Sequence, residues 1–250
     1  MSQITKTRIE QFQELGYFVT GVVFDPHELD ELAQDMERVY EEDLVELERN
    51  GTPEQVEMHK NQRSYDHFHE RSPVARRFVK KPFYCEASRT FIGDEVDLYW
   101  NQAMSKPPAR GRTFGWHQDS GYAVTEPLHY ITCWTAVSDS TIDNGCVWII
   151  PGSHRWGLLP HVRQPSTADT YPGLTAQFSD ESGAIPVPLR AGQVAIFSSL
   201  MLHKSGPNTS RSIRRGFIPQ YHVPNPLRID NGEVFGDCFP ILRNGKPVES

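Results

Sequence analysis

The chain has 250 residues and a formal net charge of −7, with charged residues of both signs mixed along its length. A protein that binds nucleic acid or an anionic membrane surface needs a basic face, so this balance argues against both kinds of partner. The sequence starts without a basic and apolar leader, has no run approaching about 18 apolar residues, and carries four cysteines without a C-x-x-C pair, which predicts a soluble cytoplasmic protein.

The first 80 residues predict mostly helices. Ile9, Phe12 and Leu15 recur at helical spacing, and Gly16 ends that run. A short extended piece is expected over residues 17–23.

A second helix is predicted to begin after Asp25. This residue can cap the helix, Pro26 suits the first helical position, and Glu28 completes a capping box. Apolar residues recur along one face as far as Leu47, and Gly51 is expected to end the helix.

Two stretches lack a clear hydrophobic period. Residues 59–71 are polar and aromatic, and we expect a loop that could fold over a pocket. Residues 160–188 are rich in proline and predict a long insertion. Loops of this kind vary freely and often close binding sites, so both stretches are candidates for a lid.

From Glu95 onward the pattern changes to short strands separated by Gly, Pro, Asn and Asp. The predicted strands cover residues 96–104, 130–137, 146–150, 194–198 and 213–223. Many short strands in about 130 residues predict a β-sandwich or barrel behind an N-terminal helical layer.

His117 and Asp119 form an H-x-D pair within Trp116-His117-Gln118-Asp119. Residues two apart on a strand point to the same side, so an imidazole and a carboxylate placed this way can bind one metal ion. Such a pair is common by chance, and by itself it equally fits two surface residues joined by a hydrogen bond.

His203 supplies a third candidate ligand. It follows an apolar, strand-like run and precedes a turn, which places it at the exit of a buried strand. Two histidines and one carboxylate make the facial triad of non-haem Fe(II) oxygenases, which leaves coordination positions open for a chelating 2-oxo acid and O2.

Arg214 lies eleven residues after His203, on the next predicted strand. A guanidinium binds a carboxylate through two parallel hydrogen bonds, so Arg214 is the candidate partner for the far carboxylate of 2-oxoglutarate. Arg215 would point to the opposite face of the strand, and Arg211 sits in the preceding turn. One inward and two solvated arginines explain this basic cluster without a phosphate site.

Five blocks of sequence together resemble the phytanoyl-CoA dioxygenase family of Fe(II)/2-oxoglutarate enzymes. They are Lys106-Pro107-Pro108, Trp116-His117-Gln118-Asp119, Cys133-Trp134-Thr135-Ala136, Asn144-Gly145-Cys146 with Pro151-Gly152-Ser153-His154, and His203-x-Ser205-Gly206-x-Asn208 followed by Arg214. The resemblance covers about residues 17–222. Each block alone is weak evidence, but their order and spacing are specific.

The resemblance implies a mainly β fold with supporting α-helices, built on a double-stranded β-helix, or cupin-like jelly roll. We expect a single domain over residues 1–250, with a mostly helical layer over 1–94, the jelly-roll core over 95–225 and a C-terminal extension over 226–250.

The resemblance also implies roles for particular residues. His117, Asp119 and His203 would bind Fe(II), and Arg214 would anchor 2-oxoglutarate, the co-substrate used with O2. Three further residues would line the 2-oxoglutarate pocket: Gln102, Trp134 and Ser205. Related halogenases replace the acidic ligand by a small residue, so the acid present here points to hydroxylation or another C–H oxidation. The expected partner is a small metabolite or a natural-product intermediate.

Several other residues have both a functional and a structural interpretation. His154 follows Pro151-Gly152-Ser153 and reads as a turn residue rather than a second metal ligand. His67 and His69 are two apart, but a polar loop explains them equally well. The aromatic residues near the motifs could shape the pocket or pack in the core; these are Trp116, Tyr122 and Trp148.

Two other functions stay open at this point. A Zn(II) hydrolase can use the same three ligands with a bound water, although it has no need of Arg214. A cupin-type binding module could keep the pocket without turnover. The sequence does not distinguish hydroxylation from desaturation, ring closure or demethylation, and it does not indicate an oligomeric state.

Overall fold

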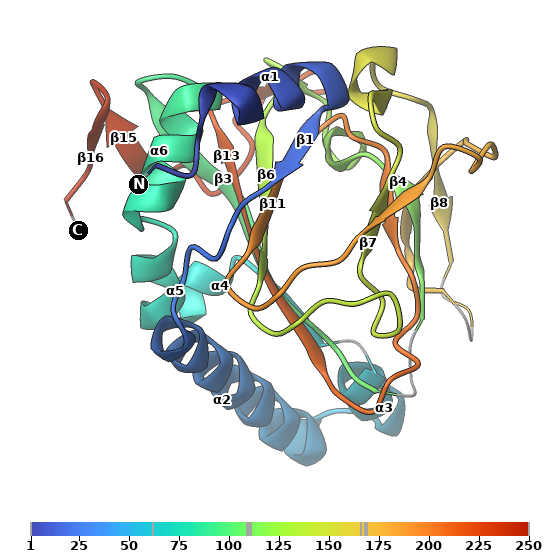
Figure 1. Cartoon of the computed structure of the whole chain (residues 1–250). Helices are drawn as coiled ribbons and strands as arrows, with labels where there is room; N and C mark the ends of the chain where they lie inside the picture. The colour runs from blue at the N-terminus through green and yellow to red at the C-terminus, as the bar shows by residue number, and fades with distance from the viewer. Residues whose placement is uncertain (1, 62, 109–111, 166, 168–169, 250) are drawn as a thin grey trace.

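The computed structural model describes residues 2–61, 63–108, 112–165, 167 and 170–249. Two antiparallel sheets face each other, and helices cover the outer face of the larger one (Figure 1). This is the mainly β, jelly-roll architecture with supporting helices that the sequence predicted.

The large sheet has the strand order β1-β11-β6-β13-β3-β15-β16, and β2 also pairs with β3. β2 and β15 pair with opposite halves of β3. The strands are β1 (Tyr17–Val19), β2 (Arg63–Asp66), β3 (Val96–Lys106), β6 (Ile131–Ala136), β11 (Val194–Ser198), β13 (Arg214–His222), β15 (Phe239–Arg243) and β16 (Lys246–Pro247). β1 and β2, from the N-terminal part of the chain, and β15 and β16, from its C-terminal part, therefore extend the jelly roll.

The small sheet has the order β10-β7-β12-β4. Its strands are β4 (Phe114–His117), β7 (Val147–Ile149), β10 (Ile185–Val187) and β12 (His203–Ser205). Two further two-stranded sheets pair β5 (Thr125–Glu126) with the distant β14 (Leu227–Arg228), and β8 (His161–Gln164) with β9 (Gly173–Ala176). The five strands that the sequence predicted are thus confirmed as β3, β6, β7, β11 and β13.

The helices are α1 (Lys6–Leu15), α2 (Pro26–Asn50), α3 (Pro53–Asn61), α4 (Phe68–Arg71), α5 (Pro73–Phe78) and α6 (Pro82–Phe91), with short 3-10 turns η1 (Asp119–Gly121) and η2 (Ser153–Trp156). Gly16 ends α1 in the left-handed region at φ 81°. Asp25 and Glu28 form the predicted capping box of α2, and Gly51 follows its last residue. No helix in the described part of the chain has the length and apolar composition needed to cross a bilayer.

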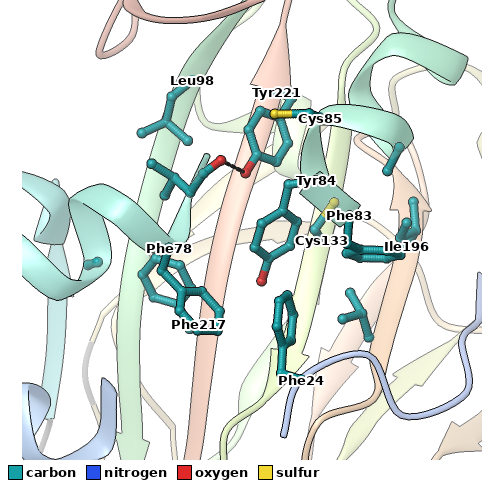
Figure 2. Packing of buried hydrophobic residues seen from close by; sticks show 14 of the residues in the cluster. Phe24, Phe78, Phe83, Tyr84, Cys85, Leu98, Cys133, Ile196, Phe217 and Tyr221 are labelled. Carbon is teal, nitrogen blue, oxygen red and sulfur yellow. Dashed lines mark hydrogen bonds between the residues drawn. The ribbon is translucent and has the colours of Figure 1, made fainter. Parts of the chain in front are cut away.

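Aromatic side chains fill the core between the helices and the large sheet (Figure 2). Phe78 of α5 meets Phe217 of β13 edge to face, with ring centroids 5.7 Å apart. Two buried tyrosines also satisfy their hydroxyls: Tyr84 lies 2.5 Å from the Thr135 hydroxyl, and Tyr221 donates to the Val79 carbonyl at 2.7 Å. This layer fixes β6 and β13, which carry part of the site described below.

The expected loop over residues 59–71 is wrong for the residues that the structure describes there, which leave out residue 62. His59 belongs to α3, Arg63–Asp66 form β2 on the edge of β3, and α4 follows. Phe68 is fully buried and anchors this segment. The strand escaped detection because it is short and polar, and its order comes from pairing with a distant strand rather than from its own pattern.

The expected insertion over residues 160–188 is also wrong in part. It contains the β8–β9 pair and then β10, which pairs with β7 and so belongs to the jelly roll. Pro186 lies within β10. Proline is disfavoured in central strands because it has no N–H to donate, but β10 is an edge strand, where the missing N–H is tolerated. Residues 166, 168 and 169 of this segment lie outside the described part of the chain.

Replacing Phe217 with alanine should lower the free energy of unfolding by about 3 to 5 kcal/mol, since it removes a fully buried ring from between α5 and the sheet. Urea unfolding followed by circular dichroism measures this. Ile229→Ala is the control, because Ile229 is 62% exposed and its loss should change stability by less than about 0.5 kcal/mol. Equal losses in the two variants would contradict the assignment of this core.

Candidate active site

Strand pairing brings His117 and His203 together. The two residues are direct partners in the register between β4 and β12, and their ring centroids lie 4.1 Å apart. Asp119 opens η1 immediately after β4, and its Oδ1 lies 3.9 Å from Nε2 of His117 and 3.6 Å from Nε2 of His203. The three predicted ligands therefore meet at one point.

Backbone carbonyls orient both imidazoles. Nδ1 of His117 lies 2.8 Å from the oxygen of Gly115, and Nδ1 of His203 lies 2.9 Å from the oxygen of Met201. Each Nδ1 therefore carries the proton and donates it, which leaves the Nε2 lone pair free to face Asp119. Burial, followed by the nearby His203, lowers the pKa of His117 well below its ordinary value, which favours the neutral ring that can bind a metal.

Two residues on the large sheet hold the carboxylate of Asp119. Thr132 Oγ1 donates to Oδ2 at 2.5 Å, and Gln220 Nε2 donates to the same oxygen at 3.0 Å. The other oxygen, Oδ1, is the one that faces the histidines. Sequence reasoning missed Thr132 and Gln220, because they meet only through the register between β6 and β13.

The donor set fits a divalent transition metal. Within the described part of the chain, His117, Asp119 and His203 form the one group of three His, Cys, Asp or Glu side chains whose ligand atoms all lie within 4.8 Å of one another. Two neutral imidazoles and one carboxylate on one side of the ion match the facial triad of Fe(II) oxygenases.

A cavity of about 470 Å³ lies between the two sheets and contains the triad in its wall. Both sheets line it: Trp134 and Ile218 come from the large one, and Val147 and Ser205 from the small one. A volume in this range suits a small organic molecule. The triad thus lines a cavity between the two sheets rather than the outer surface of the molecule.

Arg214 lies at one end of this cavity and is only 1% exposed. Its Nη1 donates to the Gly145 carbonyl at 2.6 Å, but its Nε has no partner and no carboxylate of the described residues pairs with it. Burial lowers the pKa of Arg214 to about 10. As predicted, Arg215 turns the other way and pairs with Glu37 at 2.9 Å.

Lys106 is a second buried basic residue, directly opposite Arg214 in the register between β3 and β13. Its Nζ donates to Ser205 Oγ at 2.9 Å and to the Gly206 carbonyl at 2.5 Å. Burial, and then the charge of Arg214, lower its pKa well below the ordinary value. Facing like charges are destabilising, so an anion bound between the strands would relieve both cations. The sequence motif contained Lys106 but gave it no role.

The three residues expected to line the 2-oxoglutarate pocket all border the cavity. The guanidinium carbon of Arg214 lies 5.1 Å from the Trp134 ring centroid, and Ser205 accepts the hydrogen bond from Lys106. A Cβ at Gly216 would lie 2.7 Å from the Trp134 ring, so glycine lets this ring lie against β13. Gln102 lies farther along β3, where its amide donates to Asp66 at 2.7 Å.

Most of the residues for which the sequence allowed either a functional or a structural role have a structural one. Tyr122 lines the cavity, whereas Trp116 and Trp148 pack in a separate cluster. His154 lies outside the cavity wall, and its Nε2 is 3.3 Å from the carbonyl oxygen of Gln13. His67 and His69 lie in the segment that was expected to be a loop. Both contact Asp237, and neither lines the cavity.

A family model described as "Phytanoyl-CoA dioxygenase (PhyH)" matches residues 12–216 of the chain. "Phytanoyl-CoA dioxygenase domain-containing protein 1" of Mus musculus is 31% identical over 155 residues, which cover 60% of this chain and 53% of the relative. "Ectoine dioxygenase" of Bordetella bronchiseptica is 24% identical over 266 residues, which cover 95% of this chain and 86% of the relative. The chain thus spans about half the length of the first curated relatives that it matches.

A solved structure, EvdO2 from Micromonospora carbonacea var. aurantiaca complexed with 2-oxoglutarate, matches with a TM-score of 0.69 and 19% identity. The match covers 92% of this chain and 95% of that chain. At this identity the likeness concerns the fold, and it agrees with the two facing sheets described above.

Replacing Gln220 with methionine should weaken Fe(II) binding about 10- to 100-fold, because it removes a hydrogen bond that orients the Asp119 carboxylate. Anaerobic competition with a chromogenic iron chelator measures this affinity. The exposed Gln13→Met is the control and should bind Fe(II) like the unchanged protein. Unaltered affinity in Gln220→Met would mean that this contact does not support a metal site.

Proposed function

The chain belongs to the phytanoyl-CoA dioxygenase (PhyH) family, and from this membership and the site we propose that it is an Fe(II)- and 2-oxoglutarate-dependent oxygenase. The reaction would oxidise, and in the simplest case hydroxylate, an unactivated C–H bond of a small molecule. The observation that carries the proposal is the convergence of His117, Asp119 and His203 in the wall of the cavity that also holds the incompletely paired Arg214.

In this proposal the triad holds the iron through Nε2 of His117, Oδ1 of Asp119 and Nε2 of His203. The backbone carbonyls behind both rings fix their tautomers, and Thr132 and Gln220 fix the carboxylate. Three ligands on one side leave the opposite side open to the cavity. When bound, iron together with 2-oxoglutarate and O2 supplies the oxidising power to break a C–H bond, with release of succinate and CO2.

Arg214 and Lys106 would receive the C5 carboxylate of 2-oxoglutarate. The Nε–H of Arg214 has no partner and can donate to the carboxylate, and the amino group of Lys106 lies opposite it. Both side chains are buried. Trp134 would cover one side of the co-substrate, and Ser205 would keep Lys106 in place. A zinc hydrolase that uses only the triad and a water molecule does not need these two buried basic residues.

The acidic ligand favours hydroxylation over halogenation, because the Asp119 carboxylate fills the position that a halide would otherwise need. The chain's own residues would position the substrate and keep the reacting centre dry rather than take part in bond breaking. Phe197, Ile218 and Val147 provide apolar walls beside the triad for this purpose.

Adding Fe(II) and then 2-oxoglutarate to the protein under anaerobic conditions should produce a visible metal-to-ligand charge-transfer band. The band requires iron to be chelated by the 2-oxo acid, so Zn(II) in place of Fe(II) should give none. A protein that binds Fe(II) but never develops the band would contradict the proposed co-substrate and would favour the hydrolase or a non-catalytic binding module.

Arg214→Gln should raise the 2-oxoglutarate concentration at half-maximal band intensity about 10- to 100-fold, because it removes charged hydrogen bonds to the carboxylate. Arg211→Gln is the matched control: it makes the same change in net charge at an exposed position and should leave the titration unchanged. Similar 2-oxoglutarate affinities in both variants would rule out Arg214 as the anchor.

A further inference from the structure

Apart from Asp119 of the metal triad, Asp66 is the one Asp or Glu among the residues that line the cavity. Asp66 is the last residue of β2, it is exposed and lines the cavity, and no lysine, arginine or histidine of the described residues pairs with it. Neither the metal triad nor the 2-oxoglutarate pocket uses this side chain. An unpaired charge in a binding cavity is a candidate for ligand recognition.

Two neutral side chains hold Asp66 in position. Gln102 Nε2 donates to Oδ1 at 2.7 Å, and Trp100 Nε1 donates to the same oxygen at 3.3 Å. Both partners also line the cavity. Because both hydrogen bonds go to Oδ1, the second oxygen keeps its capacity to accept, and the negative charge is oriented without being neutralised.

Aromatic rings surround the same region. Trp100 and Phe235 stack with ring centroids 5.8 Å apart and an angle of 11° between their planes. Tyr99 and Tyr122 complete this part of the wall. The negative faces of aromatic rings attract cations, so rings beside a carboxylate favour a positively charged organic group over a neutral or anionic one.

The cations closest to this region already have partners. Arg228 lies 5.4 Å from the Phe235 ring centroid but pairs with Asp230, and Lys204 pairs with Glu181. Arg63, at the other end of β2, pairs with Glu37 at 3.2 Å. His67, next to Asp66 in the chain, pairs with Asp237. The negative charge on this side of the cavity therefore comes from Asp66 together with Asp119 of the triad.

The sheet register places Asp66 beside the path of the co-substrate rather than on it. Asp66 is opposite Gln102 on β3, and Gln102 is opposite Ile218 on β13. Since neighbouring strands are about 4.8 Å apart, Asp66 lies about 10 Å across the sheet from β13, the strand that carries Arg214. A molecule can therefore contact Asp66 while the 2-oxoglutarate position near Arg214 is filled.

We propose that the primary substrate carries a cationic nitrogen group, an amine or amidine in its protonated form, which Asp66 binds within the aromatic wall formed by Trp100, Phe235, Tyr99 and Tyr122. That the bound molecule is oxidised rests on the proposed function; the charge preference itself does not. One end of the molecule would be held by Asp66, and the C–H bond to be oxidised would lie toward the triad.

Calorimetric titration of the metal-free full chain with two probes tests the preference. Benzylammonium and benzyl alcohol have nearly the same size and an aromatic ring, but the first is charged and the second is neutral. The charged probe should bind at least about tenfold more tightly, as expected for a hydrogen bond to a charged group. Equal affinity for the two probes, or no binding of benzylammonium, would overturn the proposal.

Asp66→Asn should abolish the difference between the probes while keeping the acceptor oxygen that Gln102 and Trp100 use. Asp30→Asn, which makes the same change in net charge on the exposed face of α2, should retain it. A preference that survives in Asp66→Asn would assign it to another group and refute the role of Asp66. Because no iron or 2-oxoglutarate is present, this result is independent of the charge-transfer measurement.

Discussion

The pairing of β4 with β12 is the constraint on which the proposed chemistry depends. It places His117 opposite His203 across two strands that are far apart in the sequence, and the turn after β4 then brings Asp119 to the same point. The carbonyls of Gly115 and Met201 fix both rings through backbone contacts. A metal site built on a strand register is rigid, because a slip of one residue would turn one imidazole to the opposite face of the sheet.

The interior of the cavity has a marked asymmetry of charge. Among the described residues, Arg214 in the cavity wall and the buried Lys106 opposite it on β3 have no acidic partner, and Asp66 of β2 has no basic one. Burying unpaired cations is costly, and a protein retains such groups when a ligand completes them. In the proposed function the anion is 2-oxoglutarate at Arg214, and in the further proposal the cation is the substrate group at Asp66.

Sequence reasoning succeeded where the signal is local. The alternation along β13 turns Arg214 inward as the sequence predicted. The sequence also predicted that His117 and Asp119 lie together, but for another reason: β4 ends at His117, and Asp119 reaches the same point from η1 rather than from the strand. Sequence reasoning failed where the contact exists only across strands: Thr132 and Gln220 support Asp119 through the β6–β13 register, and no feature of either residue's neighbourhood indicates this. The segment over residues 59–71 was missed for the same reason, since β2 exists through its pairing with β3.

An anaerobic crystal structure of the protein with Fe(II) and 2-oxoglutarate tests the central claim most directly. Iron is expected on Nε2 of His117, Oδ1 of Asp119 and Nε2 of His203, with the C5 carboxylate of the co-substrate against Arg214. Iron bound at another place, or a co-substrate whose far carboxylate lies away from Arg214, would contradict it.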